Sequence, residues 1–265
     1  MKLALTQMNV IWEAPEENRL QCQRLTKEAS ENHCDWIVFP ELTLTGFTMN
    51  PEEFREDPYG YSPTKKFFQE LSHKYSIGIV FGYIAVQEGR NYNHLAIVHG
   101  GRTIMEYAKL HPFSFGSEAE HYTGGSQIAT CQVPIANHKE ICLSGFICYD
   151  LRFPEIFQLA SKKAELIFVI ANWPKERIRH WHILLQARAI ENQCFIIGVN
   201  RTGTGGGLCY PPSSMAFDPY GEPIAAGPAE LLYADIHPEL ATEYRKEFPL
   251  KKDRREEIYQ PNILL

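Results

Sequence analysis

Cys148 is the residue whose type and setting point most directly to chemistry, in the stretch SGFICYDLRFPE at 144–155. Residues 140–147 are mostly apolar and rich in β-formers, which predicts a buried strand. Pro154 and Glu155 suit the first turn of a helix. Cys148 is therefore expected where a strand turns sharply into a helix, beside free backbone N–H groups, as in the nucleophile elbow of serine hydrolases. A cysteine there is a candidate nucleophile; the alternative is a small buried apolar residue, as most free cysteines are.

Glu41 and Lys109 also follow predicted strands. Glu41 comes after the short buried strand 36–39, where a carboxylate can point into a cleft and act as a base; the alternative is a surface acid. Lys109 follows the strand 103–108, and an ammonium in a dry site stabilises a thiolate and an oxyanion; the alternative is a solvated lysine. Because open α/β sheets form their sites at strand ends, we expect Glu41, Lys109 and Cys148 to converge in one pocket.

The elements that must position these residues alternate between helices and strands. Residues 110–127 have no clean period and carry Pro, Gly and Ser, which predicts a long loop, and a loop of that length is usually functional. No linker, low-complexity segment or short repeat is present, so we expect one α/β domain over residues 1–265, with mixed sheets covered by helices. The expected helices span 15–31, 64–75, 154–162, 175–193 and 238–246, and the expected strands span 3–10, 36–39, 77–86, 95–98, 103–108, 128–133, 140–147, 166–171, 195–200, 214–217 and 231–235.

Composition and charge exclude several classes of protein. The 265 residues are 44% hydrophobic and 22% charged, as in a globular protein with a sizeable core. The formal net charge of −6, without a long run of one sign, argues against a nucleic-acid surface or a polybasic anchor, and no apolar run reaches the length of a membrane span. Met1-Lys2 leads straight into a predicted strand, so no signal peptide is expected. Seven cysteines without a paired framework predict reduced thiols and a cytoplasmic protein.

Two other features look like ligand sites but do not qualify. The segment GTGGG at 203–207 follows a strand, as a phosphate-binding loop does, but LCYPP at 208–212 cannot open the required helix, so a flexible loop is expected. His180 and His182 lie two apart on a predicted helix and do not share a face, so they cannot together bind a metal. No pair of Cys-x-x-Cys motifs is present, so we expect no metal site.

Three segments resemble the signatures of the nitrilase superfamily of carbon–nitrogen hydrolases: FPEL at 39–42, KLH at 109–111 and CYDLRFPE at 148–155, in this order. The resemblance covers nearly the whole chain and implies a four-layer α-β-β-α sandwich with two mixed sheets. It also implies that Cys148 is the nucleophile and Glu41 the general base. Lys109 would stabilise the oxyanion together with the backbone N–H of Tyr149.

A second glutamate of the family, on the loop after the lysine, falls on Glu118, with Glu120 as the competing position. One departure is Gly145-Phe146, where the family more often has aliphatic residues. We expect this departure to alter the packing behind the nucleophile and to leave the catalytic positions intact. The resemblance implies no metal or organic cofactor.

Further segments narrow the resemblance to omega-amidases of the bacterial type: NWP at 172–174, HW at 180–181, ARAIENQ at 187–193, VNRTG at 199–203 and, in the tail, YR at 244–245, FP at 248–249 and DR at 253–254. Those enzymes hydrolyse the terminal amide of 2-oxoglutaramate and 2-oxosuccinamate, which implies a small-molecule amide substrate and a thioester on Cys148. One alternative is another hydrolase of the superfamily, for deaminated glutathione or N-carbamoyl compounds. A non-catalytic binding module ranks last because the triad is complete.

A substrate carboxylate needs a cation or oriented N–H groups. The candidates near the predicted strand ends on the Cys148 side are Arg152, Arg177, Arg179 and Arg201, with Trp173 and Phe115 as possible pocket walls. The family commonly pairs two sandwiches, and residues 244–265 end in the apolar Ile263-Leu264-Leu265, so a homodimer or higher homo-oligomer is expected. A frayed end is the alternative for this tail.

Overall fold

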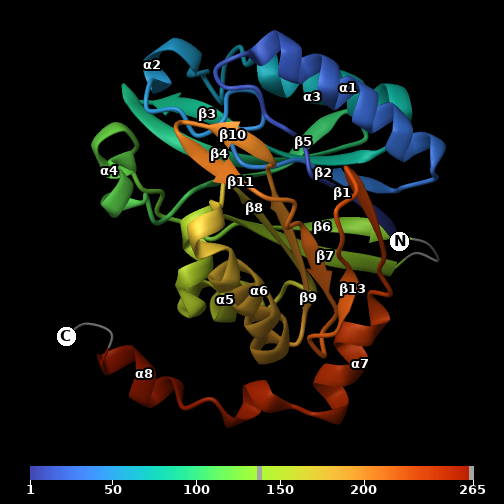
Figure 1. Cartoon of the computed structure of the whole chain (residues 1–265). Coiled ribbons are helices and arrows are strands. Elements are labelled where there is room, and N and C mark those ends of the chain that lie inside the picture. Colours follow the sequence, from blue (N-terminus) through green and yellow to red (C-terminus); the bar gives the residue numbers. More distant parts are fainter. Residues whose placement is uncertain (136–138, 263–265) are drawn as a thin grey trace.

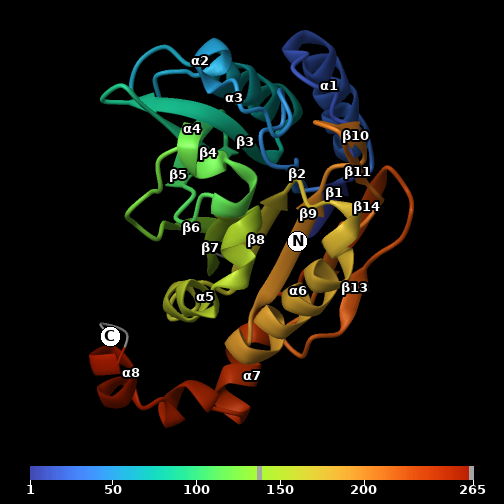
Figure 2. The same ribbon diagram turned by 60° about the vertical axis from the view of Figure 1, so that its left-hand side comes forward.

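Two six-stranded sheets lie face to face at the centre of the molecule, in a computed structural model that describes residues 1–135 and 139–262. Each sheet mixes parallel and antiparallel neighbours. Helices cover the outer face of each sheet, so that the layers run α-β-β-α (Figure 1, Figure 2). The four-layer sandwich expected from the sequence is confirmed.

Each sheet has its own order of strands and its own pair of covering helices. The first sheet contains β14 (Leu231–Asp235), β1 (Lys2–Thr6), β2 (Trp36–Val38), β3 (Gly78–Gln87), β4 (Arg90–His99) and β5 (Arg102–Ala108), with α1 (Pro15–Glu31) and α3 (Pro63–Tyr75) packed on it. The second contains β13 (Pro223–Ala225), β12 (Met215–Phe217), β9 (Phe195–Asn200), β8 (Leu166–Ala171), β7 (Lys139–Ile147) and β6 (Thr130–Ile135), covered by α5 (Pro154–Ala160) and α6 (Ile178–Asn192).

The inner strands of the first sheet, such as β1 and β3, are buried on both faces because alternate side chains serve two cores. In β1, Leu3 and Leu5 pack into the core between the two sheets, whereas Ala4 lies in the core beneath α1 and α3. In β4, Leu95 and Ala96 divide in the same way. This double burial explains why the strands appear in the sequence as apolar runs rather than as alternating patterns.

Strand direction brings the chemically interesting residues to one edge of the sandwich. Within the first sheet β2, β3 and β5 run the same way, since β4 is antiparallel to both of its neighbours. Within the second sheet β7, β8 and β9 are parallel. Glu41 lies just beyond β2, and Lys109 and Cys148 directly follow β5 and β7. All three therefore come from carboxyl ends of parallel-running strands, as the sequence predicts.

Several predicted elements are corrected by the structure. Residues 110–127 are not a bare loop, because they contain the 3₁₀ helix η1 (Ser114–Gly116) and α4 (Glu118–His121). Residues 203–207 are not a flexible loop either: β10 (Gly203–Gly205) pairs with β11 (Leu208–Tyr210). Gly206 and Gly207 supply the positive φ values, 55° and 78°, that a two-residue hairpin turn requires. The expected helix 175–193 begins as a 3₁₀ turn, η4 (Lys175–Arg177).

Other elements were not predicted or were misjudged in length. The strand expected at 3–10 ends at Thr6, and the one expected at 95–98 begins at Arg90. The helices α2 (Pro51–Phe54) and α8 (Glu256–Asn262) and the strand β13 were not expected, whereas α7 (Glu239–Glu247) was. The apolar end, Ile263-Leu264-Leu265, lies outside the described residues. Across 1–135 and 139–262, no helix has the length and apolar character needed to cross a membrane.

Candidate active site

Cys148 stands at the junction of β7 and the 3₁₀ helix η3 (Cys148–Arg152). Its φ of 48° lies in the left-handed region, a strained conformation for a residue with a side chain. The buried carboxylate of Asp150 holds this turn, since it accepts hydrogen bonds from the Ile147 N–H at 3.2 Å and the Tyr107 hydroxyl at 2.7 Å. The predicted sharp turn is therefore present, and the N–H of Tyr149 lies in the first turn of η3, where amides have no acceptor within the helix.

Glu41, Lys109 and Glu118 form one buried ionic cluster. The Lys109 Nζ lies 3.2 Å from Glu41 Oε1 and 2.8 Å from Glu118 Oε2, and none of the three side chains is more than 1% exposed. Glu118 Oε2 also accepts a hydrogen bond from the Phe113 N–H at 2.6 Å, which fixes it at the start of α4. Glu120 is exposed, so the structure places Glu118 rather than Glu120 beside the lysine.

Two buried asparagines, neither of which was assigned a role in the site from the sequence, hold Glu41 from either side. Asn93 Nδ2 donates to Glu41 Oε1 at 2.7 Å. Asn172 donates to Glu41 Oε2 through its backbone N–H at 2.8 Å and through Nδ2 at 3.2 Å. Asn172 directly follows β8, so the strand-end argument that found Glu41 also applies to it. Asn93 lies in the first half of β4, among Arg90, Asn91 and His94 and ahead of the apolar run that predicts the strand, so no local signal in the sequence distinguishes it.

Burial and charge set the protonation of the nucleophile and of the cation. Burial raises the pKa of the Cys148 thiol well above its ordinary value; Glu41 raises it further, and Lys109 only partly offsets this. Burial lowers the pKa of Lys109, but the carboxylates of Glu118 and Glu41 together raise it by more, so the lysine is an ammonium. The resting Cys148 is therefore a thiol beside a permanent cation, and attack requires a base to take its proton.

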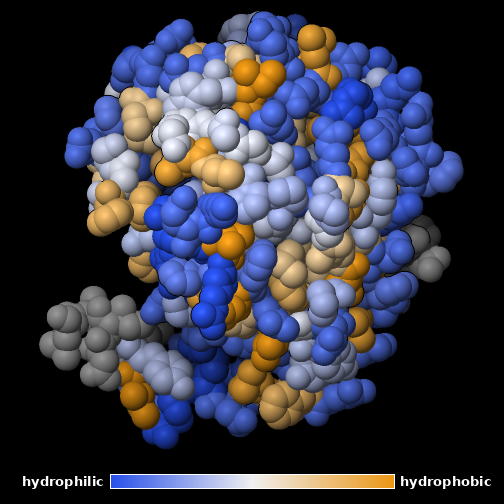
Figure 3. Space-filling model, viewed as in Figure 1, coloured by the Kyte–Doolittle hydropathy of each residue, from blue (hydrophilic) through white to orange (hydrophobic). Residues whose placement is uncertain are grey.

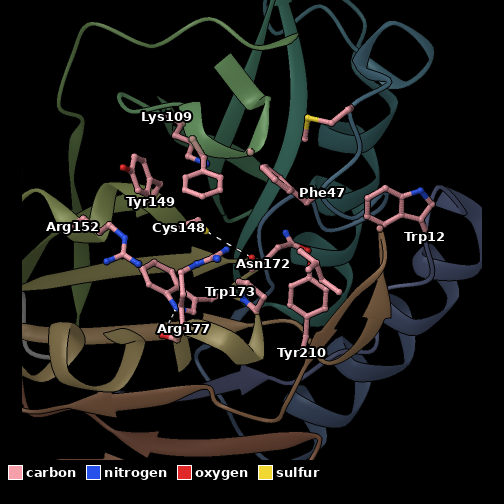
Figure 4. Close-up of a pocket in the computed structure, with 16 residues that line it drawn as sticks. Trp12, Phe47, Lys109, Cys148, Tyr149, Arg152, Asn172, Trp173, Arg177 and Tyr210 are labelled. Atoms are coloured by element: carbon pink, nitrogen blue, oxygen red, sulfur yellow. Dashed lines mark hydrogen bonds between the residues drawn. The ribbon is translucent and has the colours of Figure 1, made fainter. Parts of the chain in front are cut away.

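A cavity of about 280 Å³ opens onto Cys148 and Lys109 (Figure 4). Among the described residues that line it, the charged ones are Lys109, Arg152 and Arg177, and the rest are mainly aromatic or apolar. The walls lie on opposite sides of Cys148, with Trp12, Phe47 and Tyr210 on one side and Tyr149 and Arg152 on the other. Such a lining, apolar with a few convergent polar groups, is typical of a small-molecule site.

The predicted substrate-binding residues divide into two groups. Arg152, Trp173 and Arg177 line the cavity. Arg201 does not: its side chain is buried, and it donates hydrogen bonds to the carbonyl oxygens of Val10, Thr202 and Thr204. Burial also lowers the pKa of Arg201. These hydrogen bonds hold β10 of the β10–β11 hairpin in place, so this arginine has a structural role.

Two further candidates lie away from the cavity. Phe115 is 89% exposed and does not line it; Phe113 takes the place expected for an aromatic wall. Arg179 is exposed on the first turn of α6. The apolar walls Trp12, Phe47 and Tyr210 were not expected, because they come from loops and a hairpin whose path depends on the assembled sheets.

A thiol, an ammonium and a carboxylate at one cavity are the groups needed for covalent attack on a carbonyl. No trio of His, Cys, Asp or Glu side chains in the part of the chain that the structure describes is placed to hold a metal ion. The expectation that the chemistry needs no cofactor stays a prediction.

The fold and this arrangement of residues place the molecule among hydrolases of carbon–nitrogen bonds. The chain belongs to the carbon–nitrogen hydrolase family, whose model matches residues 2–246. It is 32% identical to the 2-oxoglutaramate amidase of Bacillus subtilis over 97% of this chain and 98% of that protein. It is 31% identical to the omega-amidase YafV of Escherichia coli over 97% of both chains.

A solved structure agrees with these relatives. XC1258 from Xanthomonas campestris, a CN-hydrolase superfamily protein with an arsenic adduct in its active site, superposes with a TM-score of 0.86 at 28% identity and covers 96% of this chain and 97% of that one. The membership of the nitrilase superfamily expected from the sequence is confirmed, and curated relatives on the omega-amidase branch support the narrower resemblance.

Proposed function

We propose that this protein is an amidase that hydrolyses the terminal amide of short 2-oxo dicarboxylic monoamides, such as 2-oxoglutaramate and 2-oxosuccinamate, to the acid and ammonia. The observation that carries the proposal is the buried cluster of Glu41, Lys109 and Glu118 beside Cys148, in a cavity whose charged lining is cationic. The two relatives named above, at about one-third identity over nearly the full length, support it.

In the acylation step, Glu41 takes the proton of the Cys148 thiol as the sulfur attacks the amide carbonyl. The negative charge that develops on the carbonyl oxygen is stabilised by the Lys109 ammonium and the backbone N–H of Tyr149. Glu41 then returns its proton to the amide nitrogen, the C–N bond breaks and ammonia leaves. The product of this step is a thioester on Cys148.

In the second step, water replaces ammonia. Glu41 takes a proton from the water, which attacks the thioester carbonyl, and the carboxylic acid leaves as the Cys148 thiol is restored. Glu118 holds the Lys109 ammonium through both of its carboxylate oxygens, at 2.9 and 2.8 Å, and so keeps the cation in place through the cycle. Removing one such oxyanion donor typically costs about 3 kcal/mol in the barrier.

The charges around the cavity favour a 2-oxo acid over an amino acid. Arg152 and Arg177 line the cavity and no acidic side chain among the described lining residues opposes them. Glu41 and Glu118 are buried and pair with Lys109, so Arg152 and Arg177 are the lining cations that these carboxylates do not pair with. A carboxylate therefore finds a positive potential at the two arginines, whereas the ammonium of glutamine meets repulsion from them.

The test compares ammonia release from 2-oxoglutaramate, glutamine, simple nitriles and peptide-like amides at matched concentrations. We expect kcat/KM to be far higher for 2-oxoglutaramate than for glutamine. Cys148→Ala should fold normally and release no ammonia, and mass spectrometry should locate the trapped acyl group on Cys148. Faster turnover of nitriles or long N-acyl compounds would reject the substrate, and an adduct on another cysteine would reject the mechanism.

We also propose a homodimer or higher homo-oligomer in a reducing compartment such as the cytoplasm. Apolar side chains on adjacent outer helices, Leu159 of α5 with Ile183 and Ile190 of α6, are about half exposed. Figure 3 shows hydrophobic side chains interspersed with hydrophilic ones over this face. All seven cysteines are free, which supports the compartment. Light scattering at micromolar concentration should give at least a dimer mass; a monomer mass contradicts the proposal.

A further inference from the structure

We infer that Arg177 binds the substrate carboxylate, an assignment that rests on the proposed amidase function. Its guanidinium lines the cavity that holds Cys148 and makes no hydrogen bond or ion pair with any described residue. Its nearest aromatic contact is Phe113, whose ring centroid lies 5.4 Å from the guanidinium carbon. A guanidinium with five donors and no acceptor, facing a partly enclosed cavity, matches a planar carboxylate.

Arg152, the other arginine of the cavity, is already engaged. Its Nη2 lies 3.3 Å from His180 Nδ1. Its guanidinium carbon lies 4.9 Å from the Trp173 ring centroid and 5.9 Å from that of Tyr149. These contacts fix Arg152 as part of the wall, where its charge adds to the positive potential but its donors are less available.

The backbone that carries Arg177 is held firmly. The Trp173 indole N–H donates to the Arg177 carbonyl at 2.8 Å, and the Trp173 ring packs 5.5 Å, centroid to centroid, from the fully buried Trp181 of α6. The arginine is thus fixed relative to both β8 and α6. A cation whose backbone does not move binds an anion at a smaller entropic cost than a free surface side chain.

Arg177 is also the residue that directly precedes α6, and no side chain caps the first N–H groups of this helix. The partial positive charge at the start of a 15-residue helix adds to that of the guanidinium. Figure 4 shows Arg177 and Cys148 facing the same space. A substrate with an amide at one end and a carboxylate at the other can therefore reach both groups at once, which a monofunctional amide cannot.

The experiment measures kcat and KM for two substrates that differ only at the group in question. They are 2-oxoglutaramate and 4-oxopentanamide, in which a methyl group replaces the carboxylate. Arg177→Gln should lower kcat/KM for 2-oxoglutaramate by roughly 100-fold, mainly through KM, since it removes two charge-assisted hydrogen bonds. Its effect on 4-oxopentanamide should be less than about threefold. Arg177→Lys should recover only part of the loss, because an ammonium cannot bind in a bidentate manner.

Arg179→Gln is the matched control, because it removes the same charge two residues away on the exposed surface of the same helix start. It should leave both substrates unchanged. Equal losses for both substrates in Arg177→Gln overturn the assignment, as does a selective loss in Arg152→Gln that Arg177→Gln lacks. If the wild-type protein turns over 4-oxopentanamide as well as 2-oxoglutaramate, the proposed substrate fails independently of which arginine is changed.

Discussion

Glu41 accepts four hydrogen bonds, two on each carboxylate oxygen. Asn93 and Lys109 donate to Oε1, and Asn172 donates twice to Oε2. Both asparagines leave their own Oδ1 buried without a partner among the described residues, which costs about 1–3 kcal/mol each. Turning either amide round would place its oxygen against a carboxylate oxygen. The orientation of the two amides is thus set by Glu41, at the expense of stability.

Asn172→Ala tests whether this arrangement matters for turnover. The variant keeps the backbone N–H of residue 172 but loses the side-chain donor, so Glu41 is held in fewer directions and kcat should fall about tenfold or more with little change in KM. Asn192→Ala is the matched control: Asn192 is equally buried and bonds Ser161 and Arg188, away from the cavity. If both variants lose kcat only in proportion to their loss of melting temperature, Asn172 has no positioning role.

The raised pKa of Cys148 gives a pH dependence with a definite sign. Because burial and then Glu41 raise the pKa of this thiol well above its ordinary value, the thiolate is a minor species whose share grows continuously with pH. Alkylation of Cys148 by iodoacetamide should therefore accelerate steadily between about pH 6 and pH 9. Peptide mass spectrometry measures the rate, with the exposed Cys209 as an internal reference. A rate that is high and constant across this range would mean that the resting enzyme already holds a thiolate.

At the scale of the elements, the sequence predicts the features that depend on the local residue pattern, namely the strands and the residues that follow them. Apolar runs with Gly or Pro at their ends predict most strands, and the strand-end argument predicts that Glu41, Lys109 and Cys148 lie together, as they do in the structure. Arg201 was misjudged because a strand-end cation looks the same in sequence whether it faces a cavity or supports a hairpin. Trp12 was missed because its place in the wall depends on packing against Gly205 and Gly206, nearly two hundred residues away along the chain.

The burial of His94 in β4 of the first sheet can be tested through the free energy of unfolding, without measuring turnover. Burial, together with the smaller effect of the nearby Lys65, lowers the pKa of His94 to about 4. The unfolded chain binds this proton from about pH 6.5 downward but the folded protein does not, so the free energy of unfolding should fall by about 3 kcal/mol between pH 6.5 and pH 4 from this residue. Urea unfolding at a series of pH values should show a shallower loss in His94→Gln. The exposed His237→Gln is the control. If the free energy of unfolding falls with pH as steeply in His94→Gln as in the wild type, the buried, neutral His94 is not the cause of the loss.

At the scale of the whole molecule, the candidate site belongs to neither sheet alone. The first sheet supplies Glu41 and Lys109, the second supplies Cys148 and Asn172, and the hydrogen bonds of Asn172 to Glu41 join the two across the sandwich. The distance between nucleophile and cation is therefore set by how closely the sheets pack. A change in that packing should affect turnover even when it lies several residues from the chemistry.

Gly145 of β7 is the position at which this dependence can be measured. A Cβ added there would lie 2.8 Å from Leu95 Cδ1 of β4, in the opposite sheet, so the glycine of the departure Gly145-Phe146 allows Leu95 to pack closely against β7. Gly145→Val should push β7 away from the first sheet. We expect it to destabilise the protein by about 1–3 kcal/mol and to lower kcat by more than the loss of folded protein explains.

Gly198 of β9 provides the control, because a Cβ there would lie 2.4 Å from Leu185 Cδ1 of α6, on the outer face of the same sheet. Gly198→Val should cost comparable stability while it leaves the spacing of the sheets, and hence kcat per folded molecule, nearly unchanged. Adding Leu95→Ala to Gly145→Val should restore part of both stability and kcat, since the smaller side chain makes room for the valine. If the two valine variants lose kcat equally, or if Leu95→Ala restores nothing, the spacing of the sheets does not control the site.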